Sequence, residues 1–387
     1  MKINMVLPTV DISGGVRVIA IYAQRLAQRG HEVTCVSCTA RPASLRRKIG
    51  SLARGRGWPA NPRPRPSHMD SVDVAHRVIS PWRPIRDADV PDGDVVLATW
   101  WETAEWVAAL SPSKGAKAYL IQHHELLFEG MPRERVAATW RLPLHKITIS
   151  KWLTEVAHDT YGDPYASHVP NSVDTDQFHA PPRGRQQQPT VGMLYSATKF
   201  KGAQVSLEAI GRASKQVPGL RVVAFGAEPV NPELPLPPGA EYHHRPPQNA
   251  IKDLYAKCDV WLCGSRSEGF HLPPLEAMAC RCPVVSTRVG GSMDVIDEGV
   301  NGHLVDVGDV AALADRLTRV LKLPEPAWRQ MSDAALSTAK RYTWDDAAQR
   351  LESALHVAIR RSRNGMHTAS SADLIQAESA GLQVQGS

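Results

Sequence analysis

The sequence lacks the features that mark membrane-spanning, secreted and disordered proteins. Of its 387 residues, 43% are hydrophobic and 22% are charged, which is the balance of an ordinary globular protein of two or three domains. No run approaches the ~18 consecutive apolar residues of a transmembrane helix. The first residues, MKINMVLPTV, resemble a buried strand and contain no signal-peptide core or cleavage site. We therefore expect a cytoplasmic protein.

Cysteine is scarce, with six residues in the chain. Cys35 and Cys38 lie in the strand-like segment EVTCVSC. Their offset of three places the two thiols on opposite faces of a strand, so they cannot share one metal ion. Cys280 and Cys282 flank a predicted turn between a helix and a strand. These spacings predict reduced, structural thiols and no disulfide framework.

Acidic residues are missing from one segment. Between Arg41 and Met69 the chain has seven Arg and one Lys but no Asp or Glu, whereas the net charge of the whole chain is only +6. The basic character is therefore local and argues against a nucleic-acid surface spread over the fold. Arg, Pro and Gly dominate the segment without an apolar period, so we predict an exposed, mobile loop over residues 41–69.

Elsewhere, strand and helix patterns alternate, which is typical of parallel α/β folds. The first 38 residues read as a strand, a glycine turn, a helix that ends at Gly30 and a second strand. Further strands are predicted at 94–99, 118–122, 146–150, 190–196, 221–226, 259–265 and 283–287. Further helices are predicted at 203–216, 248–257 and 274–280, and helical patterns run from 309 to about 360.

These patterns predict an α/β architecture of two Rossmann-like, doubly wound domains that face each other across a cleft. The first domain covers residues 1–175 and is completed by a C-terminal helix at 344–360. The second covers residues 176–343, beginning near a polar, proline-rich linker. Residues 361–387 are rich in Ser, Ala, Gln and Gly. This composition predicts a disordered tail.

One segment has the form of a ligand site: DVWLCGSRSEGFHLPPLEAM. Open parallel sheets bind ligands where a strand leads into the start of a helix. Here a strand is followed by two carboxylates, Glu268 and Glu276, and Pro273-Pro274 stands where a helix should begin. Such a helix start points free backbone N–H groups at an anion. The groups in question are those of Phe270, His271 and Leu272.

This segment resembles the donor-binding region of retaining glycosyltransferases of family 4, which have the GT-B fold. The E-x7-E pattern runs from Glu268 to Glu276, within EGFHLPPLEAMACRCPVV, and is followed by VGGSMDVI and EGVNGHLV. The resemblance extends over most of the chain through the early SGG turn, HVPNSVDTDQF, Lys201-Gly202 and RYTWDD. Each piece alone is a weak signal, whereas five in order are specific. The resemblance implies that residues 176–343 bind a nucleotide diphosphate sugar.

The resemblance also implies roles for single residues of the second domain. Glu276 would accept hydrogen bonds from the ribose hydroxyls, Glu268 would lie beside the donor sugar, and Lys201 would meet the diphosphate. Tyr195 stands where the family often has an arginine, which puts the usual pair of cations in doubt. Lys199 is either a substitute cation or a surface lysine. The implied donor-binding residues of this domain are Gly269, Phe270, His271, Leu272, Glu276 and Lys199.

In the first domain, which would be the acceptor side, the segment AYLIQHHELLFEG ends a predicted strand. By resemblance, His124 faces the donor sugar, with His123 as the alternative. Gly14 and Gly15 resemble a glycine loop that closes near the phosphates, although a simple turn explains them as well. The WWETAEW cluster at Trp100–Trp106 either stacks on a sugar or fills the core. The implied catalytic residues are Glu268, His124 and Lys201.

The resemblance implies that an acceptor hydroxyl attacks the anomeric carbon from the face on which the diphosphate departs. The proton of the acceptor hydroxyl passes to the departing phosphate. No metal site is expected, because no Asp-x-Asp stands where a sugar-nucleotide metal would be held, and no cofactor is expected besides the donor substrate. The donor would be linked to UDP or GDP, and the acceptor a glycan, a lipid-linked molecule or a small molecule.

Three readings of the basic segment 41–69 stay open: peripheral contact with the anionic inner membrane surface, contact with an acidic acceptor, or a solvated insertion. Two other functions also stay open. A nucleotide-sugar 2-epimerase has the same fold, and a basic nucleic-acid-binding protein would use the segment 41–69 but leave the donor motif unexplained. We expect no nucleic-acid partner.

Overall fold

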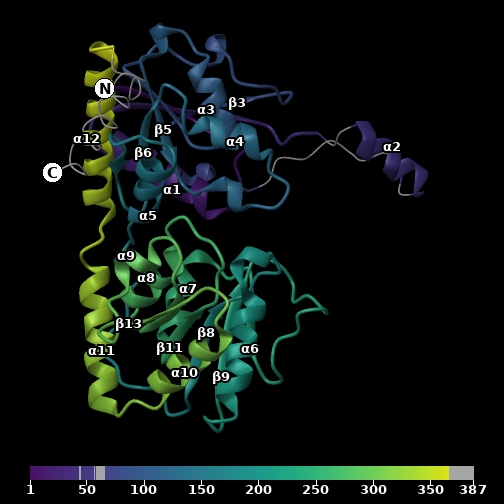
Figure 1. Cartoon of the computed structure of the whole chain (residues 1–387), viewed down its shortest axis with the longest axis vertical. Coiled ribbons are helices and arrows are strands. Elements are labelled where there is room, and N and C mark those ends of the chain that lie inside the picture. The colour runs from purple at the N-terminus through teal and green to yellow at the C-terminus, as the bar shows by residue number, and fades with distance from the viewer. Residues whose placement is uncertain (43–44, 56, 58–65, 366–387) are drawn as a thin grey trace, which may run out of the picture. The chain divides into compact units, whose positions relative to one another are not determined.

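The computed structural model describes residues 1–42, 45–55, 57 and 66–365. They form two compact units, each built on one parallel sheet (Figure 1). The first unit comprises Met1–Thr148, Thr154–Val169 and the chain from Ala348 onward. The second comprises Ile149–Leu153 and Pro170–Ala347.

The sheet of the first unit has seven parallel strands in the order β3-β2-β1-β4-β5-β6-β7. Their bounds are β1 Lys2–Val6, β2 Glu32–Cys38, β3 Ala75–Ile79, β4 Val95–Ala98, β5 Ala116–Ile121, β6 His145–Thr148 and β7 Ser167–His168. The helices of this unit are α1 Gly14–Gln28, α2 Leu45–Ala53, α3 Trp101–Ala108, α4 Arg133–Thr139 and most of α12 Trp344–Arg363, whereas the first three residues of α5 Lys151–Glu155 belong to the second unit. Helix α1 ends where the sequence predicted, since Gly30 follows it with a φ of 87°.

The sheet of the second unit has six parallel strands in the order β10-β9-β8-β11-β12-β13. Their bounds are β8 Thr190–Leu194, β9 Arg221–Gly226, β10 Glu241–His244, β11 Val260–Cys263, β12 Val284–Thr287 and β13 Gly302–Val305. The helices are α6 Ala203–Ser214, α7 Ile251–Ala256, α8 Leu272–Ala279, α9 Ser292–Val295, α10 Val310–Leu321 and α11 Glu325–Ala339. Helices α6 and α10 pack on each other over a core of buried aliphatic side chains.

Both sheets have the strand order of a Rossmann fold. In each, the first strand lies inside the sheet, the next two strands extend to one side, and the following strands extend to the other. The predicted doubly wound architecture is therefore confirmed for each unit. The points where the order reverses lie between β1 and β4 in the first unit and between β8 and β11 in the second. Ligands of such sheets bind at these switch points.

The strands that the sequence missed are β3, β7, β10 and β13, all of which lie at a sheet edge. Strand β3 (AHRVI) has mostly exposed side chains, and β10 (EYHH) has none that is buried. These two edge strands are not covered on both faces, so they show no buried apolar run in the sequence. Strand β13 (GHLV) is buried but follows the turn EGVNG, and that turn hid it.

Two predicted irregular segments contain helix. Part of the predicted loop 41–69 forms α2, because Leu45, Ile49 and Leu52 recur at helical spacing among the basic residues. Residues 43–44, 56 and 58–65 of that loop lie outside the described residues. Helix α12 continues past the predicted end at 360 to Arg363, where three arginines in the last turn favour a helix C-terminus. The remainder of the predicted tail, 366–387, also lies outside the described residues.

Candidate functional site

The switch point of the second unit carries an ion pair. Lys201 follows β8 and Glu268 follows β11, and the Lys201 Nζ lies 3.0 and 2.9 Å from the two carboxylate oxygens of Glu268. The Ser265 hydroxyl donates to the same carboxylate at 2.9 Å. The Lys201 side chain is 30% exposed, whereas that of Glu268 is 7% exposed. The pair therefore presents a cation outward from a buried carboxylate.

The charges within this pair set the protonation state of Glu268. Burial alone would raise the pKa of its carboxyl. The Lys201 charge, the neighbouring His271 and the hydrogen bonds from Lys201 and Ser265 together outweigh burial, so the pKa of Glu268 lies below its usual range. Glu268 is therefore ionised at neutral pH. The sequence predicted both residues at the site but gave them separate roles, and neither their direct pairing nor Ser265 was foreseen.

Close backbone contacts hold the two loops that carry this pair. Gly202, directly after Lys201, has a φ of 62°, and a Cβ there would lie 1.8 Å from the carbonyl oxygen of Gly264. Gly290 has a φ of 48°, and its Cβ would lie 2.6 Å from the carbonyl oxygen of Glu268. No β-carbon fits at either distance. The turn that carries Lys201 and the loop that carries Glu268 therefore require glycine at 202 and 290. This requirement arises from contacts between segments that are far apart in the sequence.

Helix α8 begins directly after the glutamate loop. It starts at Leu272, two residues before the predicted start, and Pro273 occupies its first turn as the sequence indicated. His271 precedes it and is buried. Phe270 is also buried, and the carbonyl oxygen of Gly269 accepts a hydrogen bond from the Trp152 indole at 2.9 Å. The predicted donor-binding backbone therefore lies next to the ion pair, at the start of a helix.

Glu276 lies inside α8 and faces a tyrosine. The Tyr255 hydroxyl donates to the Glu276 Oε2 at 2.9 Å, and both side chains are buried. Burial and the neighbouring Glu276 carboxylate raise the pKa of Tyr255 well above its usual value, so it remains a hydrogen-bond donor. The hydroxyl fixes the orientation of the carboxylate. The sequence predicted Glu276 but gave no signal for Tyr255, which lies 21 residues earlier.

Tyr195 and Lys199, the two positions at which the sequence left a second cation open, differ in environment. Tyr195 is buried, accepts a hydrogen bond from the Asn231 N–H at 2.9 Å and donates one to the Leu234 carbonyl at 2.8 Å. It therefore holds the loop after β9 and supplies no charge. Lys199 is exposed on the same short turn as Lys201. Of these two positions, only Lys199 carries a cation.

The predicted histidines of the first unit lie in aromatic surroundings after β5. The His124 Nε2 lies 3.0 Å from the Tyr161 hydroxyl, and its ring meets the Trp140 ring edge-on at 5.3 Å between centroids. Burial and the nearby Arg133 charge lower the pKa of His124, so its imidazole is neutral at neutral pH. The His123 ring lies 4.3 Å from that of Phe128.

A buried carboxyl, which sequence reasoning did not assign, follows these histidines. Glu125 is fully buried, and burial raises its pKa to about 8. The Tyr119 hydroxyl lies 3.4 Å from its Oε1, while its Oε2 has no hydrogen-bond partner. At neutral pH the group is mostly an uncharged acid. The adjacent letters HHE in the sequence gave no sign that the third residue points into the core.

Gly14 and Gly15 form the first turn of α1, at the switch point of the first unit. Neither has a positive φ, a β-carbon on Gly14 would meet no atom within 4 Å, and one on Gly15 would make only ordinary contact with Gln122. Neither the backbone nor the packing within this unit requires glycine here. Of the tryptophan cluster, Trp101 and Trp106 are buried, whereas Trp100 is half-buried and stacks on Phe128 at 6.2 Å.

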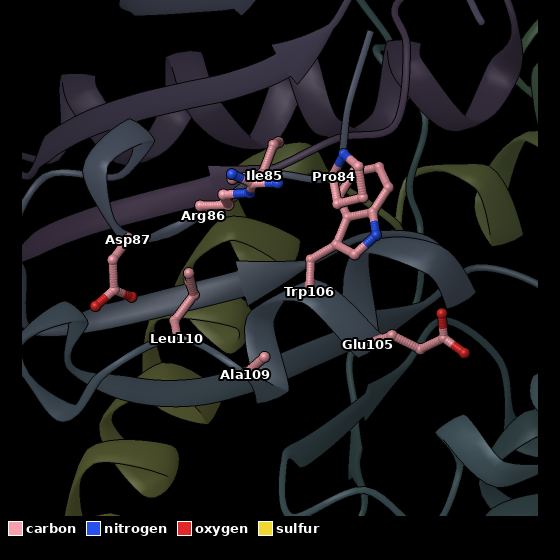
Figure 2. Close-up of a pocket in the computed structure, with 8 residues that line it drawn as sticks. All are labelled: Pro84, Ile85, Arg86, Asp87, Glu105, Trp106, Ala109 and Leu110. Atoms are coloured by element: carbon pink, nitrogen blue, oxygen red, sulfur yellow. The ribbon is translucent and has the colours of Figure 1, made fainter.

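The first unit also contains a shallow pocket of about 310 Å³. Figure 2 shows its lining, which comes from the segment Pro84–Asp87 after β3 and from the C-terminal half of α3 with the residues that follow it. Trp106 of the tryptophan cluster lines it, whereas none of the predicted catalytic or donor-binding residues does. Among the described residues, no group of three or more His, Cys, Asp or Glu is arranged to hold a metal ion.

The second half of the chain is similar to known glycosyltransferases. Residues 174–338 match the family model described as glycosyl transferases group 1. A D-inositol 3-phosphate glycosyltransferase of Mycobacterium avium is 35% identical over 162 residues, which cover 38% of this chain and 38% of that protein. An N-acetyl-alpha-D-glucosaminyl L-malate synthase of Bacillus anthracis is 35% identical over 119 residues, covering 30% and 31%. The chain thus spans less than two fifths of the length of these relatives.

Solved structures match over more of the chain. Anabaena HepE in complex with UDP-glucose aligns with a TM-score of 0.67 at 16% identity, covering 92% of this chain and all of that one. Staphylococcus aureus TarM, in complex with UDP and other ligands, aligns with a TM-score of 0.68 at 10% identity, covering 92% and 100%. At such identities the likeness establishes the fold. The predicted two-domain GT-B fold is therefore confirmed.

Proposed function

We propose that this protein is a retaining glycosyltransferase of family 4, which moves a sugar from a nucleotide diphosphate sugar to an acceptor hydroxyl. The observation that carries the proposal is the Lys201–Glu268 pair, which lies at the switch point of a Rossmann-type sheet beside the start of α8. The match of residues 174–338 to glycosyl transferases group 1 supports it independently. In this proposal residues 176–343 bind the donor, and residues 1–175, completed by the helix 344–360, face the acceptor.

The second unit would supply the charge that the reaction needs. As the bond between the anomeric carbon and the diphosphate breaks, negative charge grows on the departing phosphate. The partly exposed Lys201 ammonium is already oriented by Glu268, so it can offset that charge without rearranging. Glu276, oriented by Tyr255, would bind the ribose hydroxyls. We propose that Lys201 takes the place of a metal ion, and that no cofactor besides the donor is needed.

The transfer itself would be direct. The acceptor oxygen bonds to the anomeric carbon on the face from which the diphosphate leaves, and the acceptor's proton passes to the departing phosphate oxygen. The protein contributes position and charge rather than a covalent nucleophile. Neutral His124, or His123 beside it, would hydrogen-bond the sugar. Gly14 and Gly15 would leave room for the phosphates, since their backbone does not itself require glycine.

A nucleotide screen tests the proposal. UDP, GDP and their glucose, N-acetylglucosamine and mannose conjugates are each added to the full chain, and its melting temperature is measured. A ligand at 100 times its dissociation constant stabilises a protein by about 2.7 kcal/mol. We expect one nucleotide and its sugar conjugate to raise the melting temperature of the wild-type protein. If none does so, the proposed function is wrong.

The two alternative functions predict different results. A 2-epimerase would convert the donor sugar in the absence of any acceptor, which NMR of the nucleotide sugar detects. A nucleic-acid-binding protein would bind DNA or RNA with an affinity that falls steeply with salt. We expect neither result, because neither function explains the Lys201–Glu268 pair together with the family match.

The acceptor is proposed to be a glycan, a lipid-linked molecule or a small molecule, and helix α2 favours a lipid surface nearby. On this helix Ile49 is 55% exposed and Leu52 is 49% exposed, three residues apart and therefore on one side. Arg46 and Lys48 belong to the same helix, and Arg54 follows it. An exposed apolar side among basic residues suits the interface of an anionic membrane. We therefore propose a cytoplasmic protein with peripheral membrane contact.

A vesicle assay tests this contact. None of the described helices is long and apolar enough to cross a membrane. We expect the full chain to sediment with vesicles of mixed phosphatidylserine and phosphatidylcholine, but not with phosphatidylcholine alone. The double variant Ile49→Ser/Leu52→Ser should lose this binding. Val78→Ser, which changes another exposed aliphatic residue of the first unit, is the matched control. Equal sedimentation of all three proteins would contradict the membrane contact.

A further inference from the structure

His271 has a backbone conformation that side chains other than glycine rarely adopt. Its φ is 74° and its ψ is 72°, in the left-handed region, at the residue that precedes α8. In the described part of the chain, the other non-glycine residues with positive φ are Arg245 and Arg281, and neither is buried. His271 is only 7% exposed. Backbone strain of this kind is found most often at functional sites, where the side chain has a task that glycine cannot perform.

The imidazole of His271 is held at one end. Its Nδ1 lies 2.8 Å from the hydroxyl oxygen of Ser292, which is the first residue of α9. Its Nε2 lies 3.8 Å from the Glu268 Oε1, which is too long for a hydrogen bond. Burial lowers the pKa of His271 to about 4, against the opposing effect of the Glu268 charge. The ring is therefore neutral and polar, and its Nε2 end lies beside the ion pair.

The Lys201–Glu268 pair does not need this imidazole. Both carboxylate oxygens of Glu268 already accept hydrogen bonds from Lys201, and one accepts a further bond from Ser265. The neutral ring, at 3.8 Å, donates no hydrogen bond to that carboxylate. Glycine would also adopt the observed φ without strain. Neither the charge balance of the pair nor the turn before α8 explains a histidine here.

We propose that the Nε2 of His271 hydrogen-bonds a hydroxyl of the donor sugar and thereby helps to select which sugar the protein accepts. The inference rests on the proposed function and adds a specificity-determining side chain to it. Lys201 and Glu276 would meet the parts that all nucleotide sugars share, the diphosphate and the ribose. The His271 ring would meet the part that differs between donors.

Two substitutions separate this role from a structural one. His271→Gly removes the ring and relieves the left-handed strain, which offsets part of the stability lost with a buried side chain, so the variant should still fold. His271→Asn tolerates a positive φ, and its short amide can keep the bond to Ser292 while losing the Nε2 end. Ser292→Ala keeps the ring but removes its Nδ1 partner. All three are prepared in the full chain.

The test compares nucleotides with their sugar conjugates. Dissociation constants for UDP, GDP and their glucose, N-acetylglucosamine and mannose conjugates are measured by calorimetry for wild type and each variant. We expect both His271 variants to bind the free nucleotide as wild type does. They should bind the preferred conjugate about five- to tenfold more weakly, the effect of one lost hydrogen bond, and discriminate less between sugars. Ser292→Ala should show a smaller loss in the same direction.

Several results would overturn the inference. One is wild-type affinity and sugar preference in both His271→Gly and His271→Asn, with nucleotide binding intact; then only this inference fails. Another is a fall in melting temperature and in free-nucleotide binding in His271→Gly that His271→Asn restores, because the ring would then merely link two loops. If wild type binds neither nucleotides nor conjugates, the proposed function fails and the inference fails with it.

Discussion

The two switch points of this protein share a strand order and differ in chemistry. After β8 and β11 the second unit places a lysine, a carboxylate and a histidine in contact, all fixed by hydrogen bonds or close backbone contacts. After β1 and β4 the first unit places two glycines and Trp100, and after β5 two histidines among aromatic rings. One edge carries charge, and the other offers neutral rings and open backbone. Two sheets of the same strand order therefore carry different chemistry, because the loops after their strands differ.

The sharpest test of this contrast is Lys201→Ala. Loss of a preorganised charge at the leaving group should lower kcat about 100-fold, measured as initial rates at saturating donor. The variant should also melt at a lower temperature, because Glu268 is then a buried carboxylate without its cation. The double variant Lys201→Ala/Glu268→Gln should regain stability but not turnover. Lys199→Ala should keep a kcat near that of wild type. If instead Lys199→Ala loses turnover and Lys201→Ala does not, Lys199 is the cation that meets the diphosphate.

The second test concerns Glu125, the buried carboxyl of the first unit. Burial raises the pKa of Glu125 from 4.5 to about 8, so the folded state keeps a proton that the unfolded chain has already lost in this range. The free energy of unfolding should therefore fall as pH rises from about 4.5 to 8, by about 1.4 kcal/mol per pH unit. Glu125→Gln should remove this slope, as urea unfolding at pH 5, 6, 7 and 8 would measure. If wild type and Glu125→Gln show the same dependence of the unfolding free energy on pH, the pKa of Glu125 is not raised in the folded protein.

The third test separates binding from turnover within the charged edge. Glu276→Ala should raise the donor KM about tenfold, the effect of lost hydrogen bonds to a charged group, with a smaller change in kcat, because the ribose does not react. Tyr255→Phe keeps the carboxylate but frees its orientation, and should raise the donor KM less. A donor KM unchanged in Glu276→Ala would make Glu276 a structural residue of α8.

The smallest expected effect belongs to the aromatic edge. Trp100→Leu should raise the acceptor KM about fivefold, the effect of one aromatic contact, while the donor KM stays constant. Trp101→Leu is the matched control, since Trp101 is 5% exposed and its replacement should lower the melting temperature through a cavity. If Trp100→Leu changes the donor KM instead, Trp100 contacts the donor and its proposed contact with the acceptor is wrong.

Sequence reasoning succeeded where local composition and structure coincide. Interior strands such as β8 and β11 are predicted correctly because strands covered on both faces are apolar throughout, whereas the roles of Glu268 and Glu276 stay predictions from the spacing of a motif. It failed where the cause lies elsewhere in the chain. Strand β10 exists because β9 offers it an edge, and Tyr255 bonds Glu276 across 21 residues. The left-handed φ of His271 is likewise visible only in the folded loop.

The close contact at Gly202 has a consequence for how this protein can change over generations. Replacing Lys201 removes one side chain and leaves the turn intact, whereas any side chain at 202 would push a β-carbon into the carbonyl of Gly264. Selection on folding alone would thus preserve the glycine, whereas it would allow the lysine to be lost only together with Glu268, whose buried carboxylate it pairs. A duplicated copy that no longer catalyses a reaction would be expected to keep Gly202 and to have lost Lys201 and Glu268 together.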